Sequence, residues 1–387
     1  LLVAILRQQG KAREALDVLD MLVQHAPGNL DLRFDLSEVL LLLGDFERGW
    51  REYHYRYSLD HTKILDRKVQ KPVWDGRMMR DKTLLIHDEQ GFGDTFQFLR
   101  MVPWVKERSK AQIILQIRQE QAGFAKRMRG IDKIVHQGDL PPPFDMHCQM
   151  MTLPQVTDLK LSDLPGPMPY LSADPARVHK WRKRLANLPR PLVALVWAGR
   201  PTHFNDARRS MSLETLAPLA NEAVTFLSVQ KGDRAEDAAT PPAGMNLVNL
   251  SPEISDFEDT AAIITIADLL ISVDSSPVHL AGGLGRPAWV MLPRLPDWRW
   301  LLDRNDQRTG KAPPMKTIRV FFLLFFGMLL AACSTNLNRN AVRDDLTSAA
   351  GWSSAIVPAG NFDIAASWRQ SPPAPASSSD QPEKTLF

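Results

Sequence analysis

Short apolar runs that alternate with helix-like segments constrain the fold of this chain more than any other feature. The runs indicate strands at Thr83–His87, Gln112–Ile117, Lys133–His136, Phe144–Met150, Leu192–Ala198, Val224–Gln230, Leu269–Val273 and Ala288–Leu292. Helical patterns lie between several of them, including Thr95–Arg108, Glu214–Ala220 and Asp259–Ala267. Alternation of strand and helix predicts parallel α/β sheets.

A proline-rich stretch divides this region into two parts. Leu164–Tyr170 carries three prolines and is typical of a linker. Asp174 and Pro175 then begin a helix, with Asp174 as the N-cap and Pro175 at the first helical position. We therefore predict two α/β units, at residues 69–172 and 173–306.

The first residues repeat themselves at a fixed spacing. Gly10–Ala15 aligns with Gly44–Gly49 at an offset of 34 residues, and at that offset apolar residues of the two segments also coincide. A period of about 34 is typical of tetratricopeptide repeats. The chain begins with Leu1 inside an amphipathic helix pattern. We predict that residues 1–68 are the truncated remnant of a longer repeat array; the alternative is a plain helical hairpin.

Composition excludes some classes of protein. Hydrophobic residues make up 44% of the 387 residues and charged residues 24%, which is usual for a soluble globular protein. A net charge of +3 is too small to indicate a nucleic-acid partner. The two cysteines, Cys148 and Cys333, lie far apart, so neither a disulfide framework nor a metal site is predicted.

A glycine-rich loop follows the first predicted strand. Gln90, Gly91, Gly93 and Asp94 lie between Thr83–His87 and the next helix. The glycines let backbone N–H groups approach a ligand, and ligands of open α/β sheets bind at the carboxyl ends of strands. Asp94 at this place can take a proton from an acceptor hydroxyl. The alternative is an aspartate that only caps the helix.

A second candidate site follows the buried strand Leu269–Val273. Asp274 ends the strand, and Ser275 or Ser276 begins the next helix. The N-terminus of that helix offers N–H groups and a positive dipole end to a diphosphate. His279 lies about one turn into the helix, near the same ligand. The alternative for His279 is a packed histidine that bonds the backbone.

Basic residues follow two further strands of the second unit. Gly199 ends one strand and precedes a loop that contains Arg209, and Lys231 ends another. Arginine pairs well with phosphate, and Lys231 can neutralise a departing phosphate. The alternative for each basic residue is an exposed surface position with no binding role.

Absent motifs narrow the choice of chemistry. The sequence has no Asp-x-Asp pair, no Walker-type P-loop and no Gly-x-Gly-x-x-Gly after its first strand. Kinase, ATPase and dehydrogenase functions therefore lose their main support. Without an Asp-x-Asp pair, the usual metal-binding signature of one large class of glycosyltransferases is also missing.

In this order, the motifs resemble bacterial tetratricopeptide-repeat glycosyltransferases, which are related to the heptosyltransferase family. The resemblance covers roughly residues 1–303. It rests on Trp74-Asp75-Gly76, His87–Thr95, Val196–Gly199, Ser228–Gly232, Asp274–Gly282 and Pro296–Leu301.

This resemblance implies a GT-B fold and inverting sugar transfer without a protein-bound metal or cofactor. It implies that Asp94 is the general base beside the acceptor-side loop of Gln90, Gly91 and Gly93. The residues implied to bind the diphosphate of the donor are Lys231, Asp274, Ser275, Ser276, His279 and, less directly, Arg209, with Gly199 beside them. A nucleotide sugar and a glycan or protein acceptor are the expected partners, with a protein partner for the repeats and no nucleic acid. The other hypothesis is an inactive repeat scaffold that keeps a GT-B remnant.

The end of the chain departs from this family. Instead of a last strand and closing helix, a basic start at Met315–Arg319 precedes the apolar run Val320–Ala332 and Cys333. This resembles a lipoprotein signal peptide, since a run of about 13 residues is short for a membrane span but right for a signal segment. We expect residues 307–387 to come from a second reading frame and the Pro/Ser-rich end to be disordered; a true membrane anchor is the alternative. We expect the main part of the chain, before residue 307, to lie in the cytoplasm. Cys333 is the candidate for lipidation, and residues 318–333 are the segment that could associate with a membrane.

Overall fold

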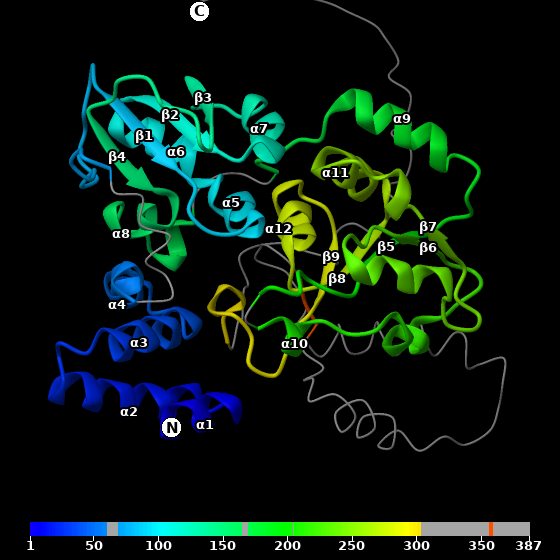
Figure 1. The fold of residues 1–387 in the computed structure, drawn as a ribbon, viewed down its shortest axis with the longest axis horizontal. Coiled ribbons are helices and arrows are strands. Elements are labelled where there is room, and N and C mark those ends of the chain that lie inside the picture. The colour runs from blue at the N-terminus through cyan, green and yellow to red at the C-terminus, as the bar shows by residue number, and fades with distance from the viewer. Residues whose placement is uncertain (60–68, 165–168, 204, 303–355, 359–387) are drawn as a thin grey trace, which may run out of the picture. The chain divides into compact units, whose positions relative to one another are not determined.

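The computed structural model describes residues 1–59, 69–164, 169–203, 205–302 and 356–358 (Figure 1). Its first part is helical. The elements are α1 (Leu2–Gln8), α2 (Ala12–His25), α3 (Leu30–Leu42), α4 (Phe46–Tyr53) and the 3-10 helix η1 (His54–Ser58).

Glycine turns the chain at the same place in both halves of this helical segment. Gly10 and Gly44 have φ angles of +75° and +85°, in the left-handed region that favours glycine. Gly49 lets α4 approach α3 closely, because an added Cβ would lie 2.7 Å from Cδ2 of Leu41. The repeated turn and the close helix contact agree with the predicted 34-residue repeat.

The first sheet has the order β3-β2-β1-β4, and all its pairs are parallel. Its strands are β1 (Thr83–His87), β2 (Gln112–Ile117), β3 (Lys133–His136) and β4 (Met146–Gln149). The helices of this unit are α5 (Phe92–Phe98), α6 (Met101–Ser109), α7 (Gln119–Lys126) and α8 (Leu153–Val156), with short 3-10 helices η3 (Met150–Thr152) and η4 (Leu161–Asp163). The loop from β1 to α5 lies at the carboxyl edge of the sheet, where ligands of such sheets bind.

The second sheet has the order β10-β9-β8-β5-β6-β7 and is parallel except for β10. Its strands are β5 (Leu192–Val196), β6 (Thr225–Ser228), β7 (Leu247–Asn249), β8 (Leu269–Val273), β9 (Ala288–Met291) and β10 (Ile356–Pro358). Its α-helices are α9 (Pro175–Leu185), α10 (Asp206–Arg209), α11 (Phe257–Ile266) and α12 (Ser276–Gly283). Its 3-10 helices are η5 (Leu213–Leu219), η6 (Asp233–Ala239), η7 (Ser251–Glu253) and η8 (Trp298–Trp300).

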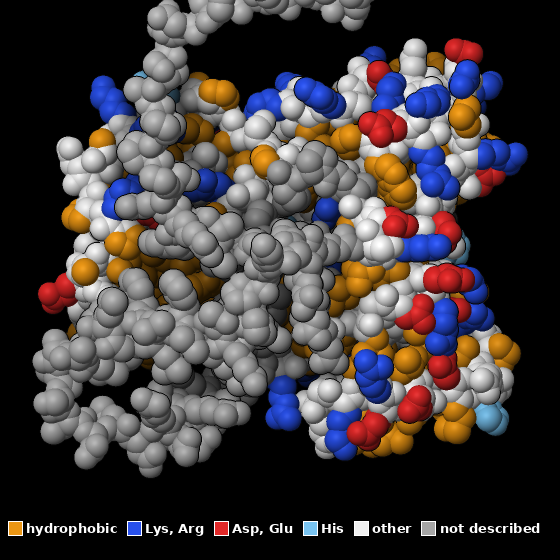
Figure 2. All heavy atoms as spheres, turned by 180° about the vertical axis from the view of Figure 1, so that it is seen from behind, with side chains coloured by type: hydrophobic (Ala, Val, Ile, Leu, Met, Phe, Trp, Pro, Cys, Tyr) orange, Lys and Arg blue, Asp and Glu red, His pale blue; other side chains and the backbone are white. Residues whose placement is uncertain are grey.

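Buried apolar side chains join the helical segment to both sheets. One contiguous cluster includes Trp50 of α4, Phe96 of α5 and Val196 of β5. A second cluster around Trp197 and Phe226 covers the other face of the second sheet. On the face drawn in Figure 2, basic and acidic side chains are mixed over the described part, in agreement with the small net charge.

Most predicted elements are present, and the exceptions have local causes. The eight predicted strands agree with the structure to within two residues at each end, whereas the three-residue strands β7 and β10 are too short to be predicted from the pattern. The single helix predicted over Thr95–Arg108 is wrong. The chain forms α5 and α6 instead, with Pro103 in the first turn of α6, where a missing N–H costs nothing. The helix predicted over Glu214–Ala220 is the 3-10 helix η5, which contains Pro218.

The predictions for residues 307–387, including Cys333 and the segment 318–333, lie outside the described residues apart from β10. They stay predictions. Within the described ranges, no helix combines the length and the apolar character that crossing a membrane requires.

A buried carboxylate holds α9 against α11 and predicts how stability depends on pH. Asp259 is fully buried and accepts hydrogen bonds from Trp181 Nε1 at 2.7 Å, Arg177 Nη1 at 2.9 Å and Ser255 N at 2.9 Å. Burial alone would raise the pKa of Asp259, but these donors outweigh it and hold the pKa below its ordinary value. A depressed carboxyl pKa stabilises the fold above the unfolded pKa of about 3.9, and this contribution is lost as the pH falls.

We therefore expect Asp259→Asn to lower the free energy of unfolding at pH 7 by about 2–3 kcal/mol. The variant should also lose less stability than the wild type between about pH 4 and pH 2. Urea unfolding at a series of pH values measures both effects, with the exposed Asp81→Asn as control. Parallel pH profiles for Asp259→Asn and the wild type would contradict this account.

Candidate active site

Three of the predicted positions share one edge of the second sheet. Strand β5 lies between β8 and β6, and all three are parallel. Gly199, Lys231 and Asp274 follow the carboxyl ends of β5, β6 and β8. The sheet therefore brings to one edge residues that lie up to 75 positions apart in the sequence (274 minus 199).

Gly199, Arg209 and Asp274 meet directly. Arg209 Nη1 donates to the Asp274 carbonyl at 2.8 Å, and Arg209 Nε donates to Asp206 Oδ1 at 3.2 Å. A Cβ at Gly199 would lie 2.5 Å from Arg209 Nη2 and 2.7 Å from Asp206 Oδ1. Because Gly199 has no side chain, the Arg209 guanidinium and the Asp206 carboxylate can lie this close to the backbone after β5.

His279 faces Asp274 from the first turns of α12. Its Nε2 lies 3.6 Å from Asp274 Oδ1, and its ring stacks on Trp300 with centroids 5.4 Å apart. Burial alone would raise the pKa of the Asp274 carboxyl, but His279 and the Arg299 charge hold it below its ordinary value. His279 therefore lies beside the carboxylate that follows β8, and its role as a diphosphate contact stays a prediction.

The two serines lie at the N-terminus of α12. Ser275 is the N-cap residue, and its hydroxyl bonds the Val273 carbonyl at 3.2 Å rather than capping the helix. Ser276 is the first helical residue. The helix therefore keeps its N-terminal partial positive charge directed at this edge of the sheet.

Asp94 lies across from the N-terminus of α12, at the third position of α5. Its Oδ2 accepts from the Gly91 N–H at 2.7 Å, so Asp94 does cap the helix, which was the alternative to a role as a base. Its Oδ1 also pairs with Arg299 Nη2 of the second unit. The Asp94 side chain is 21% exposed, so it remains open to a ligand.

Glycine also brings the two helix N-termini together. A Cβ at Gly93 would lie 2.8 Å from His279 Cδ2 and 3.5 Å from the Ser276 Cα. The α5 and α12 ribbons accordingly run side by side in Figure 1. The predicted acceptor-side loop and the predicted diphosphate site are therefore neighbours.

Arg299 belongs to the site, although the sequence assigns it no role. It lies within the Pro296–Leu301 motif, and its Nη1 also donates to Asp297 Oδ1 at 2.7 Å. Its guanidinium covers the Trp298 ring at 4.3 Å. Burial alone would lower the pKa of Arg299, but Asp297 and Asp94 outweigh it and raise the pKa. Only its position in that motif could have indicated Arg299 from the sequence, because no spacing pattern links it to the other site residues.

His203 is a second residue that the sequence does not single out. It lies in the loop between Gly199 and Arg209. Burial and the Arg209 charge lower the pKa of His203, against the opposing charges of Asp274, Asp206 and Asp94. A neutral imidazole beside these groups can accept or donate a hydrogen bond to a bound ligand.

Lys231 does not join this cluster. Its Nζ donates to the Ser251 carbonyl at 3.0 Å and to the Ile254 carbonyl at 2.9 Å. In this conformation it anchors the turn at η7. Its assignment as a diphosphate contact stays a prediction.

An open hollow of about 350 Å³ lies at the carboxyl edge of the first sheet, beside α7. It is lined by Arg118, Gln119, Glu120, His136, Gln137 and Asp139. The Arg118 guanidinium lies 5.0 Å from the Phe92 ring at the start of α5 and 3.7 Å from Asp88. The hollow therefore adjoins the loop that carries Asp94.

No group of three or more His, Cys, Asp or Glu side chains in the described residues is arranged to hold a metal ion. The predicted metal-free chemistry is not tested by this observation.

Comparison with known proteins identifies two segments. Residues 6–49 match a tetratricopeptide repeat, and residues 148–289 match glycosyltransferase family 9 (heptosyltransferase). Two segments of the chain are thus similar to known families, the first to a tetratricopeptide repeat and the second to the family 9 glycosyltransferases. The predicted GT-B class, a helical repeat in front of two parallel-sheet α/β units, is confirmed.

The individual proteins that this chain resembles are distant from it in sequence. Protein FlbA of Caulobacter vibrioides is 26% identical over 284 residues, which cover 67% of this chain and 48% of FlbA. The chain thus spans about half the length of that relative. A family 9 glycosyltransferase from Veillonella parvula has a TM-score of 0.45 at 9% identity, covering 57% of this chain and 83% of its own. ADP-heptose lipopolysaccharide heptosyltransferase II of E. coli has a TM-score of 0.43 at 13% identity. The match covers 55% of this chain and 84% of the E. coli chain.

The contact between Gly93 and His279 predicts how a larger residue at position 93 changes the stability of the fold. Alanine in the first turns of a helix is ordinarily neutral or more stable than glycine. Here the added methyl meets an imidazole that stacks on Trp300 and cannot simply move away. We expect Gly93→Ala to lower the free energy of unfolding by about 1–3 kcal/mol, the usual cost of overpacking.

Urea unfolding of Gly93→Ala measures this effect. Gly28→Ala is the matched control, because no atom lies within 4 Å of a Cβ at Gly28. If Gly93→Ala were as stable as the control variant, the close contact between α5 and α12 would be wrong.

Proposed function

We propose that this chain transfers a sugar from a nucleotide-sugar donor to a hydroxyl acceptor, with inversion at the sugar carbon and without a protein-bound metal. The observation that carries the proposal is the meeting of the α5 and α12 N-termini. A carboxylate, Asp94, lies on one side of that place, and an arginine, a histidine and a helix N-terminus lie on the other.

The charges are divided as sugar transfer requires. The acceptor hydroxyl attacks the sugar carbon while Asp94 takes its proton, and the bond to the diphosphate breaks with its electron pair leaving on the phosphate oxygen. The N-terminus of α12, His279 and Arg209 stabilise that departing negative charge. A single displacement of this kind inverts the configuration of the sugar carbon.

The two sides of the site bind different partners in this proposal. The second unit binds the donor at the edge formed by Gly199, Arg209 and Asp274. We assign the hollow beside Arg118 to the acceptor, because Arg118 also contacts Asp88 and Phe92, which precede Asp94. We propose a glycan or protein acceptor, a protein partner for the repeats, a cytoplasmic place of action for residues 1–306 and no cofactor.

Asp94 is the first residue to test. Asp94→Asn keeps the size of the side chain and can still accept from the Gly91 N–H, but it cannot take a proton. We expect turnover to fall by about two to four orders of magnitude, the usual contribution of a general base. Release of nucleoside diphosphate from a panel of nucleotide sugars measures turnover, and calorimetry checks that donor affinity is retained.

Equal turnover in Asp94→Asn and the wild type would reduce Asp94 to a helix cap. Tight binding of a nucleoside diphosphate with no turnover of any nucleotide sugar in the wild type would favour the inactive scaffold instead.

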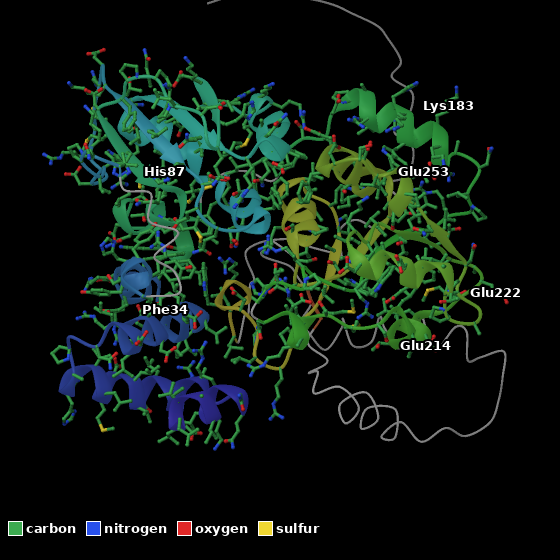
Figure 3. The ribbon with its side chains drawn as sticks, in the orientation of Figure 1. Phe34, His87, Lys183, Glu214, Glu222 and Glu253 are labelled. Carbon is green, nitrogen blue, oxygen red and sulfur yellow. The ribbon has the colours of Figure 1, made fainter. Side chains whose placement is uncertain are left out.

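His279 is the residue to test on the donor side. A charged hydrogen bond to phosphate contributes about 1.5–3 kcal/mol, so we expect His279→Ala to weaken nucleoside diphosphate binding by roughly 10- to 100-fold. Titration calorimetry measures the affinity. His179→Ala and Lys183→Ala are control variants on α9, where Lys183 lies away from the site (Figure 3). Unchanged affinity in His279→Ala would remove the diphosphate from the start of α12.

A further inference from the structure

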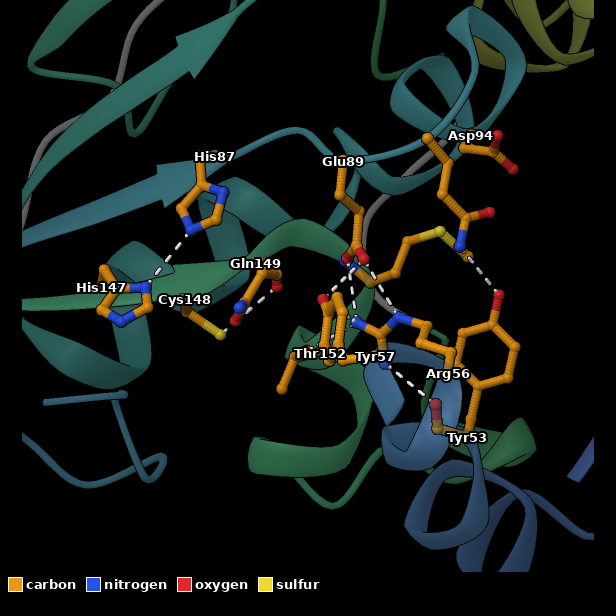
Figure 4. A network of polar contacts seen from close by, with 12 residues as sticks. Tyr53, Arg56, Tyr57, His87, Glu89, Asp94, His147, Cys148, Gln149 and Thr152 are labelled. Atoms are coloured by element: carbon orange, nitrogen blue, oxygen red, sulfur yellow. Dashed lines mark hydrogen bonds and ion pairs between the residues drawn. The ribbon is translucent and has the colours of Figure 1, made fainter. Parts of the chain in front are cut away.

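The helical segment of residues 1–59 is called the repeat segment below, because it contains the matched repeat at residues 6–49. Its last element, η1, is bound to the loop that leads to Asp94. Arg56 of η1 pairs with Glu89 in that loop, with Nε donating to Oε2 and Nη2 donating to Oε1, both at 3.0 Å. Arg56 is 1% exposed, and the Glu89 side chain is completely buried. Figure 4 shows the two side chains facing each other between the repeat and the first sheet.

Both partners of this ion pair are fully engaged. Glu89 also accepts from the Tyr57 hydroxyl at 2.6 Å and from the Met151 N–H at 2.9 Å. Arg56 also donates to Thr152 Oγ1 at 2.8 Å. A buried ion pair is weak evidence for stability, because desolvation offsets the attraction, but it fixes the geometry of the groups that it joins. The geometry fixed here is that of the loop after β1.

Tyr53 adds a second contact one residue further along the same loop. Its hydroxyl accepts from Gln90 Nε2 at 3.1 Å. Its ring also meets Trp298 edge to face, with centroids 5.7 Å apart. Trp298 directly precedes Arg299, which pairs with Asp94. Tyr53 thus contacts both the loop that leads to Asp94 and the segment that brings Arg299 to it.

We propose that Tyr53 and Arg56 are positioning residues of the transfer site, and that the end of the repeat segment holds Asp94 in place for catalysis. This inference rests on the proposed function, since it gives Asp94 the role of a base. Burial raises the pKa of Tyr53 to about 12, so its hydroxyl is uncharged at neutral pH and accepts from Gln90 Nε2 as a neutral group. The repeat is then part of the site that performs transfer and not a separate module.

Tyr53→Phe tests the proposal with a minimal change, because the ring stays against Trp298 and only the hydroxyl is lost. We expect hydrogen–deuterium exchange of the amides at 90–95 to become at least threefold faster. We also expect kcat to fall about tenfold, while the KM for the donor and the affinity for a nucleoside diphosphate stay within twofold of the wild type. Arg56→Lys, which keeps the charge but not the two-point contact, should show the same pattern.

Tyr170→Phe is the matched control. Its hydroxyl is also buried and bonds α5, but it donates to the Phe96 carbonyl beyond the loop, so exchange at 90–95 should not change. Unaltered exchange at 90–95 in Tyr53→Phe would overturn the inference, whether or not the chain is active. Faster exchange with an unchanged kcat would overturn it too, because the loop would then not need to be held.

Exchange is measured independently of turnover, so the proposed function can fail separately. If the wild type turned over no nucleotide sugar, transfer would be rejected and the positioning role would fall with it. The exchange data would then still show whether the repeat holds the loop.

Discussion

The ion pair between Arg299 and Asp94 joins the two α/β units at the place proposed for sugar transfer. Arg299 is held by Asp297 and by the Trp298 ring, and Asp94 is held by the Gly91 N–H at the start of α5. Because each partner is fixed within its own unit, the pair sets how the loop after β1 faces the N-terminus of α12. The remaining contacts of the site depend on that arrangement.

The repeat segment supports the same place from a third direction. Trp50 and Tyr53 pack against Trp298, and the Leu302 N–H donates to the Leu42 carbonyl of α3 at 2.9 Å. The helices at the start of the chain therefore contact the motif that carries Arg299. The helical start of the chain therefore contributes buried aromatic side chains around the proposed site.

Much of this arrangement follows from sequence alone, because parallel strands place their carboxyl ends together. That rule brings Gly199, Arg209 and Asp274 to one edge once β5 and β8 are recognised as neighbours. The pairing of Asp94 with Arg299 does not follow, since the two residues are 205 positions apart and no periodicity links them. Lys231 follows a strand end as predicted, but its Nζ binds backbone carbonyls in this conformation, and a strand pattern does not determine which way such a side chain turns.

The proposed transfer requires that a diphosphate binds where α12 begins, across from Asp94. A crystal structure of the 387-residue chain with a bound nucleoside diphosphate tests it most directly. We expect phosphate oxygens within hydrogen-bonding distance of the Ser276 N–H and beside His279 and Arg209, with the terminal phosphate directed toward Asp94. A diphosphate bound at any other place on the chain, with this cluster empty, would contradict the account.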